Sequence, residues 1–321
     1  MIYIGVDVGG MSIKVGFVGE DGSISRKDSF VTRVGVPAED VIKQLADFIE
    51  GMLKKSHLTK DEVMGIGLGI PGSVFRGVVK HANNLHWDNV PVVKLLSEYL
   101  GFHDDLIYAE NDANVAALGE MYFGCCQDVR NAVLVTLGTG VGTGIINDGN
   151  LLVGNGACGA EGGHMVISQN GLPCTCGRKG CWEVYASATA LIRMAREAVE
   201  AYPDSVIAEV AAANGGVSGR TAFEAYRKGC KYARRVVKTY LRNVSIGIIN
   251  LGNILRPEVI VIGGGISNQG EWFCRAIQEQ VDAEAYGGEV NPRIIIKTAT
   301  LGNDAGIIGA AALALHNNRI S

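Results

Sequence analysis

Residues 133–149 read VLVTLGTGVGTGIINDG, which is an apolar strand, a glycine-rich turn, a second strand and an Asp-Gly hairpin turn. Residues 4–22, IGVDVGGMSIKVGFVGEDG, give the same elements in the same order with short gaps. Such self-similarity indicates a duplicated α/β unit. Because one copy lies on each side of residues 115–125, we expect a domain boundary in that region.

The composition is that of an ordinary globular protein. The 321 residues are 47% hydrophobic and 19% charged, enough for two domains with cores of their own. The net charge of −4 gives no basic excess, so we expect neither a nucleic acid nor a membrane as partner. No apolar run reaches the roughly 20 residues of a membrane span. Met1 leads directly into a strand pattern without a basic segment, so we expect no secretory signal and a cytoplasmic protein.

Several further elements follow from periodicity. Residues 38–55 carry apolar side chains at helical spacing. The strand 64–70 has glycine at alternate positions, which indicates that another element packs closely on that face. Strands are also predicted at 106–109 and 259–262, one or two long helices at 222–255, and a helix of small residues at 306–315.

Three glycine-rich turns follow apolar strands, at residues 9–10, 138–140 and 263–265. Such turns expose backbone N–H groups and admit a polyphosphate, and Asp7 suits water-mediated contact with a phosphate-bound Mg²⁺. No G-x-x-x-x-G-K-[ST] loop is present. One glycine turn alone is often structural. Three of them on a duplicated unit favour a nucleotide site.

Cysteines cluster at Cys174, Cys176 and Cys181 in a glycine-rich loop. Three thiols this close can hold one tetrahedral Zn²⁺ in a reducing compartment, and His164 is the best candidate for the fourth ligand. The alternative is reduced cysteines without a metal. The other five cysteines, including the pair at 125–126, are expected to be packing residues.

Polar residues gather where the apolar patterns stop. Asn111-Asp112 follows a strand and opens a helix, and further carboxylates and amides lie at Glu161, Glu183 and in the loop 83–87. Asp112 could be simply a helix N-cap, and the other groups a solvated rim. A neutral polyol such as a sugar, however, is held by several carboxylate and amide acceptors.

Together these motifs resemble the ROK family (repressors, open reading frames and sugar kinases) of the actin-like ATPase superfamily. The resemblance extends from Asp7 to Gly306 and is most specific in Gly-x-Glu161-x-x-His164 and in Cys174-x-Cys176-Gly-x-x-Gly-Cys181-x-Glu183. It implies a duplicated actin-like ATPase (RNase H-like) fold of two domains with a cleft between them. The smaller domain would comprise residues 1–118 plus 303–321, and the larger, with the zinc loop, residues 119–302.

The resemblance also implies residue roles. Asp112 would be the catalytic base. Sugar ligands would be Gly72, Asn84, Asn111, Asp112, Glu161, His164 and Glu183. Zinc ligands would be His164, Cys174, Cys176 and Cys181. ATP with its Mg²⁺ would bind at Asp7, Gly9, Gly10, Ser12, Lys14, Gly138, Thr139, Gly140, Gly264 and Gly265. The family commonly has Thr where this chain has Met11, which is followed by Ser12.

The implied activity is ATP-dependent phosphorylation of the 6-hydroxyl of glucose, since residues 181–189 look like those of bacterial glucokinases of the family. Alternatives are another hexose (N-acetylmannosamine, allose, fructose or mannose) or a non-catalytic sugar sensor. We expect no DNA-binding helix-turn-helix of the repressor type, and the Cys-x-Cys spacing disfavours a redox protein. We expect a homo-oligomer, a dimer or tetramer.

Overall fold

The computed structural model describes residues 1–320, which form two compact units. The first contains residues 1–130, 144–160 and the chain from Thr300 onward, and the second contains residues 131–143 and 161–299. This division differs from the predicted boundaries. Residues 119–123 complete the helix that starts at Asp112, residues 124–130 follow it within the first unit, and residues 144–160 return to that unit.

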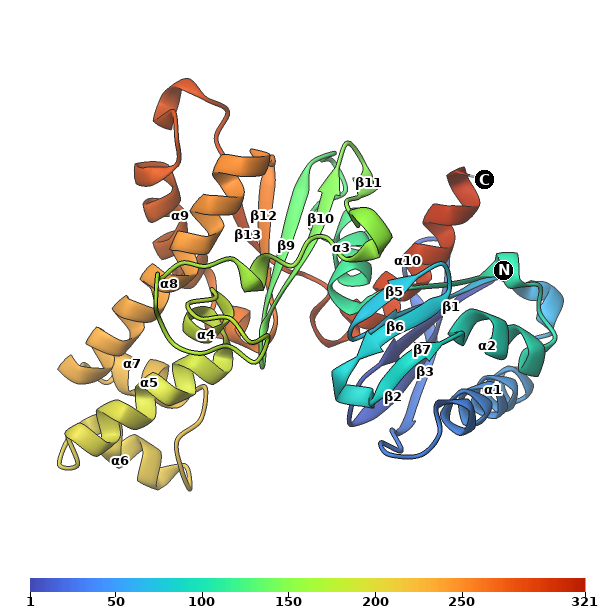
Figure 1. Ribbon diagram of the computed structural model, residues 1–321, viewed down its shortest axis with the longest axis horizontal. Coiled ribbons are helices and arrows are strands. Elements are labelled where there is room, and N and C mark those ends of the chain that lie inside the picture. Colours follow the sequence, from blue (N-terminus) through green and yellow to red (C-terminus); the bar gives the residue numbers. More distant parts are fainter. Residues whose placement is uncertain (321) are drawn as a thin grey trace. The chain divides into compact units, whose positions relative to one another are not determined.

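The first unit is built on a five-stranded sheet of order β3-β2-β1-β4-β8, in which β1 pairs antiparallel with β2 and parallel with β4. Helices α1 and α2 lie beside this sheet (Figure 1), and their apolar residues form one core with those of β1, β2 and β4. A second, three-stranded sheet of order β5-β6-β7 belongs to the same unit. The elements are β1 (Ile2–Val8), β2 (Ser12–Val18), β3 (Ile24–Val31), α1 (Ala38–Lys55), β4 (Val63–Ile70), β5 (Ser73–Phe75), β6 (Val78–Ala82), β7 (Trp87–Val90), α2 (Val92–Leu100), β8 (Ile107–Asn111), α3 (Asp112–Phe123) and α10 (Ala305–Ile320).

Helix α10 covers the other face of this sheet at unusually short range. A Cβ atom added to Gly5 would lie 1.9 Å from the carbonyl oxygen of Ile307, and one added to Gly67 would lie 1.7 Å from that of Ala310. Since no side chain fits in that space, glycine in the strands and small residues in the helix are both required. The close packing predicted for alternate positions of β4 is thereby confirmed, with α10 as the packing element.

The second five-stranded sheet has the order β11-β10-β9-β12-β13, and β12 runs parallel to both β9 and β13. Position by position this matches the first sheet, which confirms the duplicated unit that the repeated sequence predicts. Its elements are β9 (Ala132–Leu137), β10 (Val141–Asn147), β11 (Asn150–Leu151), α4 (Glu183–Ala186), α5 (Ala188–Ala201), α6 (Val206–Ala213), α7 (Thr221–Arg227), α8 (Lys231–Leu255), β12 (Val259–Gly263), α9 (Glu271–Glu284) and β13 (Ile295–Thr298).

Aromatic side chains anchor the helices of the second unit. Trp182 and Tyr240 are fully buried. The Trp182 indole N–H donates to the carbonyl of Asn243 at 2.8 Å, and the Tyr240 hydroxyl donates to the carbonyl of Ala186 at 2.7 Å. A Cβ on Gly247 would lie 2.0 Å from the Trp182 ring, so α8 accepts this indole only because a glycine faces it. Both polar atoms of these rings are satisfied, which fixes α4 against α8.

Glu120 of α3 is a buried carboxylate, 1% exposed, that organises the places where the chain leaves and re-enters the first unit. It accepts hydrogen bonds from the Cys125 N–H at 3.0 Å, from the Thr300 N–H and hydroxyl at 2.8 and 3.0 Å, and from the Leu301 N–H at 2.9 Å. Four donors compensate for the burial of the charge. The Glu120 side chain thus joins the residues after α3 to the segment at Thr300, where the chain returns to the first unit.

Glu120→Ala is expected to lower the free energy of unfolding by about 3 kcal/mol, because three partly buried N–H groups and one hydroxyl lose their acceptor. Urea denaturation followed by circular dichroism measures this. Glu197→Ala removes an exposed carboxylate of α5 and serves as the control, with a change below about 0.5 kcal/mol. Equal stability of the two variants would show that the Glu120 bonds are unimportant for the fold.

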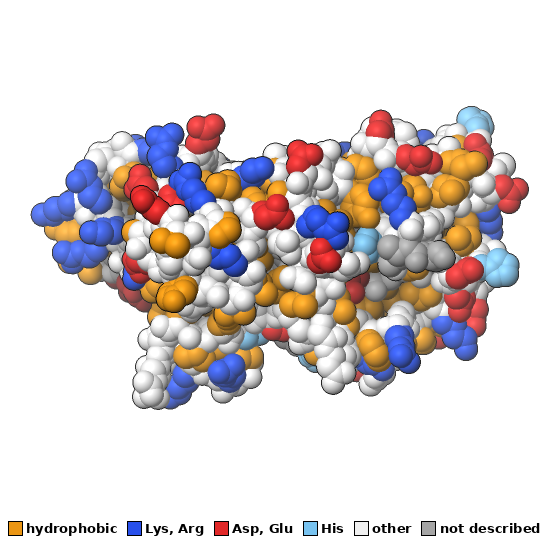
Figure 2. All heavy atoms as spheres, turned by 90° about the horizontal axis from the view of Figure 1, so that it is seen from above, with side chains coloured by type: hydrophobic (Ala, Val, Ile, Leu, Met, Phe, Trp, Pro, Cys, Tyr) orange, Lys and Arg blue, Asp and Glu red, His pale blue; other side chains and the backbone are white. Residues whose placement is uncertain are grey.

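Charges of both signs are distributed over the face of the molecule shown in Figure 2. Within residues 1–320, no helix is long and apolar enough to cross a membrane.

Candidate active site

Asn111 closes the N-terminal end of α3 and fixes the neighbouring loop. Its side-chain oxygen accepts from the N–H groups of Ala113 and Asn114 at 2.9 and 3.3 Å. Its amide nitrogen donates to the carbonyl of Gly72 at 3.0 Å. Asn111 is therefore the N-cap of α3 and is held on both sides.

Asp112 is the first residue of α3 and its side chain is exposed. One carboxylate oxygen accepts from the Ala113 N–H at 2.8 Å. The reading of Asp112 as the N-cap is wrong, because Asn111 takes that place. The positive end of the twelve-residue helix dipole attracts a negative charge at this position. An exposed carboxylate in this position can accept a proton from a substrate.

Gly72 and Asn84 lie in the same unit as Asp112. Gly72 has φ +126°, and a Cβ atom there would lie 2.2 Å from the carbonyl oxygen of His81, so this turn requires glycine. Asn84 is exposed in the 3₁₀ turn η2 (Asn83–Leu85). A Cβ on Gly10 would lie 3.7 Å from the Asn84 Cβ, so η2 adjoins the first glycine turn.

The first glycine turn has charged residues on one face of its strands. Asp7 and Lys14 are paired in the β1–β2 register, and the Lys14 ammonium lies 3.0 Å from Asp7 Oδ2. Ser12 is two residues before Lys14 in β2 and so shares this face. A Cβ atom on Gly306 of α10 would lie 2.5 Å from Asp7 Cγ. The Asp7 carboxylate therefore fits against α10 only because residue 306 is a glycine.

The residues between β1 and β2 form a tight turn. The Gly9 N–H donates to the carbonyl of Ser12 at 3.0 Å, and the Thr32 hydroxyl donates to the carbonyl of Gly9 at 2.6 Å. The Met11 side chain is 87% exposed and lies mostly in solvent.

In the second unit, the other two glycine turns adjoin each other. The Gly138 N–H donates to the carbonyl of Gly140 at 3.0 Å. Gly264 has φ +82°, and a Cβ there would lie 2.5 Å from the carbonyl oxygen of Leu137. A Cβ on Gly265 would meet nothing within 4 Å, so that side of the turn is open. The ends of β9 and β12 thus present their turns side by side.

The segment with Glu161 and His164 is attached to the start of β10. Glu161 is exposed, and His164 ends the 3₁₀ turn η5 (Gly162–His164). The Gly162 N–H donates to the Thr143 hydroxyl at 2.9 Å, and a Cβ on Gly163 would lie 2.0 Å from the carbonyl oxygen of Val141. The two glycines in this motif therefore serve close packing.

The four predicted zinc ligands converge. One side-chain atom each of His164, Cys174, Cys176 and Cys181 lies within 4.8 Å of all the others. The Sγ atoms of Cys176 and Cys181 are 3.7 Å apart, and Cys174 Sγ is 3.7 Å from His164 Nδ1. Zn–S bonds of about 2.3 Å in a tetrahedron place two sulfurs about 3.8 Å apart. The donor set and its spacing fit Zn²⁺.

The Cys176 and Cys181 thiols have pKa values shifted in opposite directions. The backbone N–H of Arg178 lowers the pKa of the exposed Cys176 thiol. Burial raises the pKa of the Cys181 thiol to about 12. A bound divalent cation deprotonates thiols that coordinate it, so the Cys181 thiol, whose pKa burial raises, would depend strongly on the ion.

The other cysteines are not all packing residues. Cys126, Cys230 and Cys274 are buried, and Cys125 is partly buried. Cys158 is exposed, so the prediction that all five pack in the interior is wrong for this residue. It lies in a turn between β11 and the Glu161 segment, where no apolar pattern marks it either way.

Sequence reasoning missed how the turn at 138–140 is held. The Ala188 N–H donates to the carbonyl of Gly138, and the Thr189 hydroxyl donates to the carbonyl of Thr139, both at 2.8 Å. Nothing in the sequence indicated these two bonds except that residues 181–189 begin at the last cysteine of the cluster. Some predicted residues are in contact within each unit: Asn111 with Gly72 and Lys14 with Asp7 in the first, and Glu183 with Cys174 in the second.

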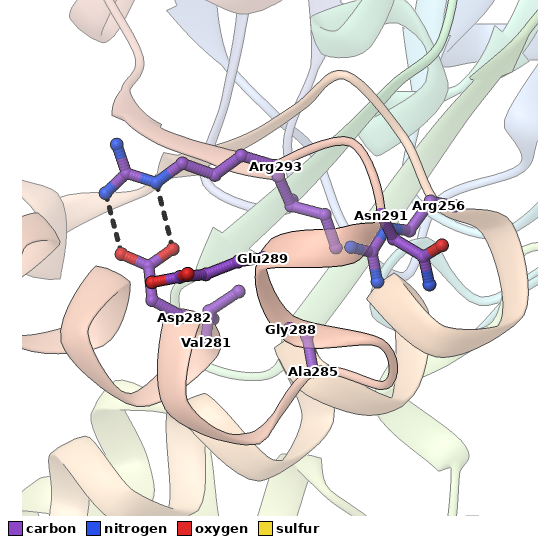
Figure 3. A pocket seen from close by; sticks show the side chains of 9 residues that line it. Arg256, Val281, Asp282, Ala285, Gly288, Glu289, Asn291 and Arg293 are labelled. Atoms are coloured by element: carbon purple, nitrogen blue, oxygen red, sulfur yellow. Dashed lines mark hydrogen bonds and ion pairs between the residues drawn. The ribbon is translucent and has the colours of Figure 1, made fainter.

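The second unit also contains a cavity of about 470 Å³ beside the end of α9 (Figure 3). None of the predicted site residues lines it. The Arg293 guanidinium pairs with both oxygens of Asp282 at 2.6 and 3.0 Å, and Arg256 donates to the carbonyls of Tyr286 and Pro292. Because its cations are engaged within the protein, we assign this cavity no ligand.

Comparisons with known proteins agree with these observations. The model of the ROK family matches residues 3–317. The glucokinase of Halalkalibacterium halodurans is 38% identical over 97% of this chain and 94% of its own length, and that of Thermotoga maritima is 36% identical over 97% and 96%. The crystal structure of a ROK family glucokinase from Streptomyces griseus in complex with glucose and AMPPNP superposes with a TM-score of 0.82, at 33% identity, over 98% of this chain and all of that one. The predicted actin-like ATPase fold is thereby confirmed, and the chain belongs to the ROK family.

Proposed function

We propose that this protein is an ATP-dependent glucokinase that phosphorylates the 6-hydroxyl of glucose, with Asp112 as the general base. The observation that carries the proposal is the Asn111–Asp112 corner, where hydrogen bonds hold both the oxygen and the nitrogen of the Asn111 side chain and the next residue is an exposed carboxylate at a helix start. The glucokinase relatives support the choice of sugar. The nucleotide analogue in the Streptomyces griseus structure supports ATP as donor, and Mg²⁺ accompanies it.

The remaining assignments are part of the same proposal. In the first unit, Gly72, Asn84 and Asn111 would bind the sugar, while Asp7, Ser12, Lys14 and the Gly9–Gly10 turn would serve the phosphates. In the second unit, Glu161, His164 and Glu183 would bind the sugar, while Gly138, Thr139, Gly140, Gly264 and Gly265 would line the nucleotide. Their support is that the side of the turn at Gly265 is open, and that carboxylates and amides suit hydroxyl groups.

The proposed reaction requires one proton transfer and one phosphoryl transfer. Asp112 would take the proton of the 6-hydroxyl as that oxygen forms its bond to the γ-phosphorus and the bond from γ-phosphorus to the β,γ-bridging oxygen breaks, which leaves ADP and a hexose 6-phosphate. Asn111 would keep Asp112 in position through its bonds to the helix and to Gly72. Backbone N–H donors of the turns would stabilise negative charge on the phosphates. Bound Mg²⁺ supplies further charge neutralisation.

Zinc would have a structural role. His164, Cys174, Cys176 and Cys181 would hold it, and the loop they fix carries two proposed sugar ligands, His164 itself and Glu183. A metal placed in this way orients substrate-binding groups without touching the reacting atoms. The proposal includes a cytoplasmic location, where thiols remain reduced, and a homo-oligomer, the commonest state of soluble assemblies.

The position of phosphorylation is tested with two deoxy sugars. 1-Deoxyglucose is expected to support ADP release from Mg-ATP, whereas 6-deoxyglucose is expected to bind as an inhibitor without being phosphorylated. A coupled ADP assay measures turnover, and phosphorus NMR of the glucose product identifies the ester. Turnover of 6-deoxyglucose, or a product phosphorylated elsewhere, would contradict the proposed acceptor.

A further inference from the structure

The carboxylate of Glu183 joins the glycine turn at 138–140 to the cysteine cluster. Glu183 is half-buried at the start of α4. Its Oε2 accepts the N–H of Val141, the residue directly after the turn, at 3.1 Å. Its Oε1 lies 3.8 Å from Cys174 Sγ. The two oxygens thus have different neighbours, and only Oε2 is committed to the backbone of the turn.

Gly140 makes this contact possible. A Cβ atom on Gly140 would lie 2.1 Å from Glu183 Oε2 and 3.0 Å from its Cδ. Gly140 does not have a positive φ, so the backbone conformation itself would admit another residue. The need for glycine at 140 therefore comes from the approach of the Glu183 carboxylate.

The segment that carries Glu183 also holds the rest of the turn. Ala188 and Thr189 bind the carbonyls of Gly138 and Thr139, and the buried Trp182 fixes the segment to α8. Glu183, Ala188 and Thr189 therefore attach residues 138–141 to one segment at three points, and the position of the turn follows the position of that segment. Of these three bonds, only the one to Glu183 involves a long, rotatable side chain with a second oxygen that can bind a ligand.

We propose that Glu183 couples sugar binding to nucleotide binding: Oε2 holds the Val141 N–H while Oε1 accepts a sugar hydroxyl. This inference rests on the proposed function, in which Glu183 binds the sugar and the turn binds ATP. A sugar on Oε1 restricts the Glu183 side chain, which in turn orders residues 138–141 before the nucleotide arrives. A ligand that meets an already ordered site loses less conformational entropy on binding, so each ligand strengthens the binding of the other.

The test is the affinity for Mg-AMPPNP, measured by calorimetry with and without saturating glucose. The ratio of the two dissociation constants is the coupling factor, expected to be at least about fivefold in the unmodified protein. Gly140→Ala pushes the carboxylate off the Val141 N–H without removing its charge, and is expected to reduce the factor to near one. Glu183→Asp, which shortens the side chain, is also expected to reduce the coupling factor to near one. It replaces Gly140→Ala in the test if that variant does not fold.

Thr189→Val is the matched control, because it loosens the same turn without touching Glu183. It is expected to change both dissociation constants by the same factor and to leave the coupling intact. Hydrogen exchange gives a second readout: glucose alone should slow amide exchange in residues 138–141 of the unmodified protein and of Thr189→Val, and not of Gly140→Ala.

The outcomes separate this inference from the function on which it rests. Glucose phosphorylation with full coupling in folded Gly140→Ala or Glu183→Asp overturns the inference and leaves the glucokinase proposal standing. The same holds if the unmodified protein phosphorylates glucose with a coupling factor of one. Failure to bind glucose at all overturns the proposed function and this inference with it.

Discussion

Asp112→Asn is expected to lower kcat for glucose phosphorylation by roughly 100- to 10,000-fold, the usual contribution of a general base. The amide cannot accept the hydroxyl proton, yet it keeps the size of the side chain at the start of α3. Glucose affinity is expected to stay within a few-fold, because Asn111 and the other proposed ligands are unchanged. The coupled ADP assay gives kcat, and calorimetry gives the glucose affinity.

The control for this variant is Asp105→Asn, which neutralises an exposed carboxylate of the same unit that has no proposed role. It is expected to retain full turnover. The loss of charge at the helix start in Asp112→Asn costs about 1 kcal/mol or less of stability, so a fall in kcat is not a folding defect. Near-normal turnover by folded Asp112→Asn would show that another group takes the proton.

Cys176→Ser is expected to release the metal and to weaken glucose binding by roughly 10- to 100-fold, the range found when groups that support a metal site are removed. The physical reason is that the loop from His164 to Glu183 loses its cross-link, and two proposed sugar ligands then lack a fixed position. Zinc content by mass spectrometry and glucose affinity by calorimetry measure the two effects.

Cys158→Ser removes an exposed thiol outside the cluster and is the matched control, with metal content and affinity unchanged. A zinc-free Cys176→Ser variant with unaltered glucose affinity and turnover would show that the cluster does not support the sugar site.

The repeated unit and most of its elements could be predicted because their signals are local. Alternate glycines in β4 predicted a close neighbour, and residues 306–315 predicted a helix of small residues, although only the structure shows that the two pack together. The zinc ligands were predictable for the same reason, since three of the four lie within one short loop.

Contacts between distant residues could not be predicted. Glu120 meets Thr300 across 180 residues of chain, and Glu183 meets Val141 across 42. No spacing rule links such pairs, because only the folded sheet brings them together. The choice between Asn111 and Asp112 as the N-cap could not be predicted for a different reason: Asn and Asp are both good caps, and the bond that also joins Asn111 to Gly72 is a contact between distant residues.

The central claim is tested most directly by ADP release from Mg-ATP against a panel of glucose, mannose, fructose, allose, N-acetylglucosamine and N-acetylmannosamine. The account predicts strong turnover with glucose and much weaker turnover with the others. Turnover on a different hexose would leave the mechanism in place and correct the substrate. No turnover on any sugar by folded, zinc-loaded protein would contradict the claim that this chain is a kinase and favour a sugar sensor instead.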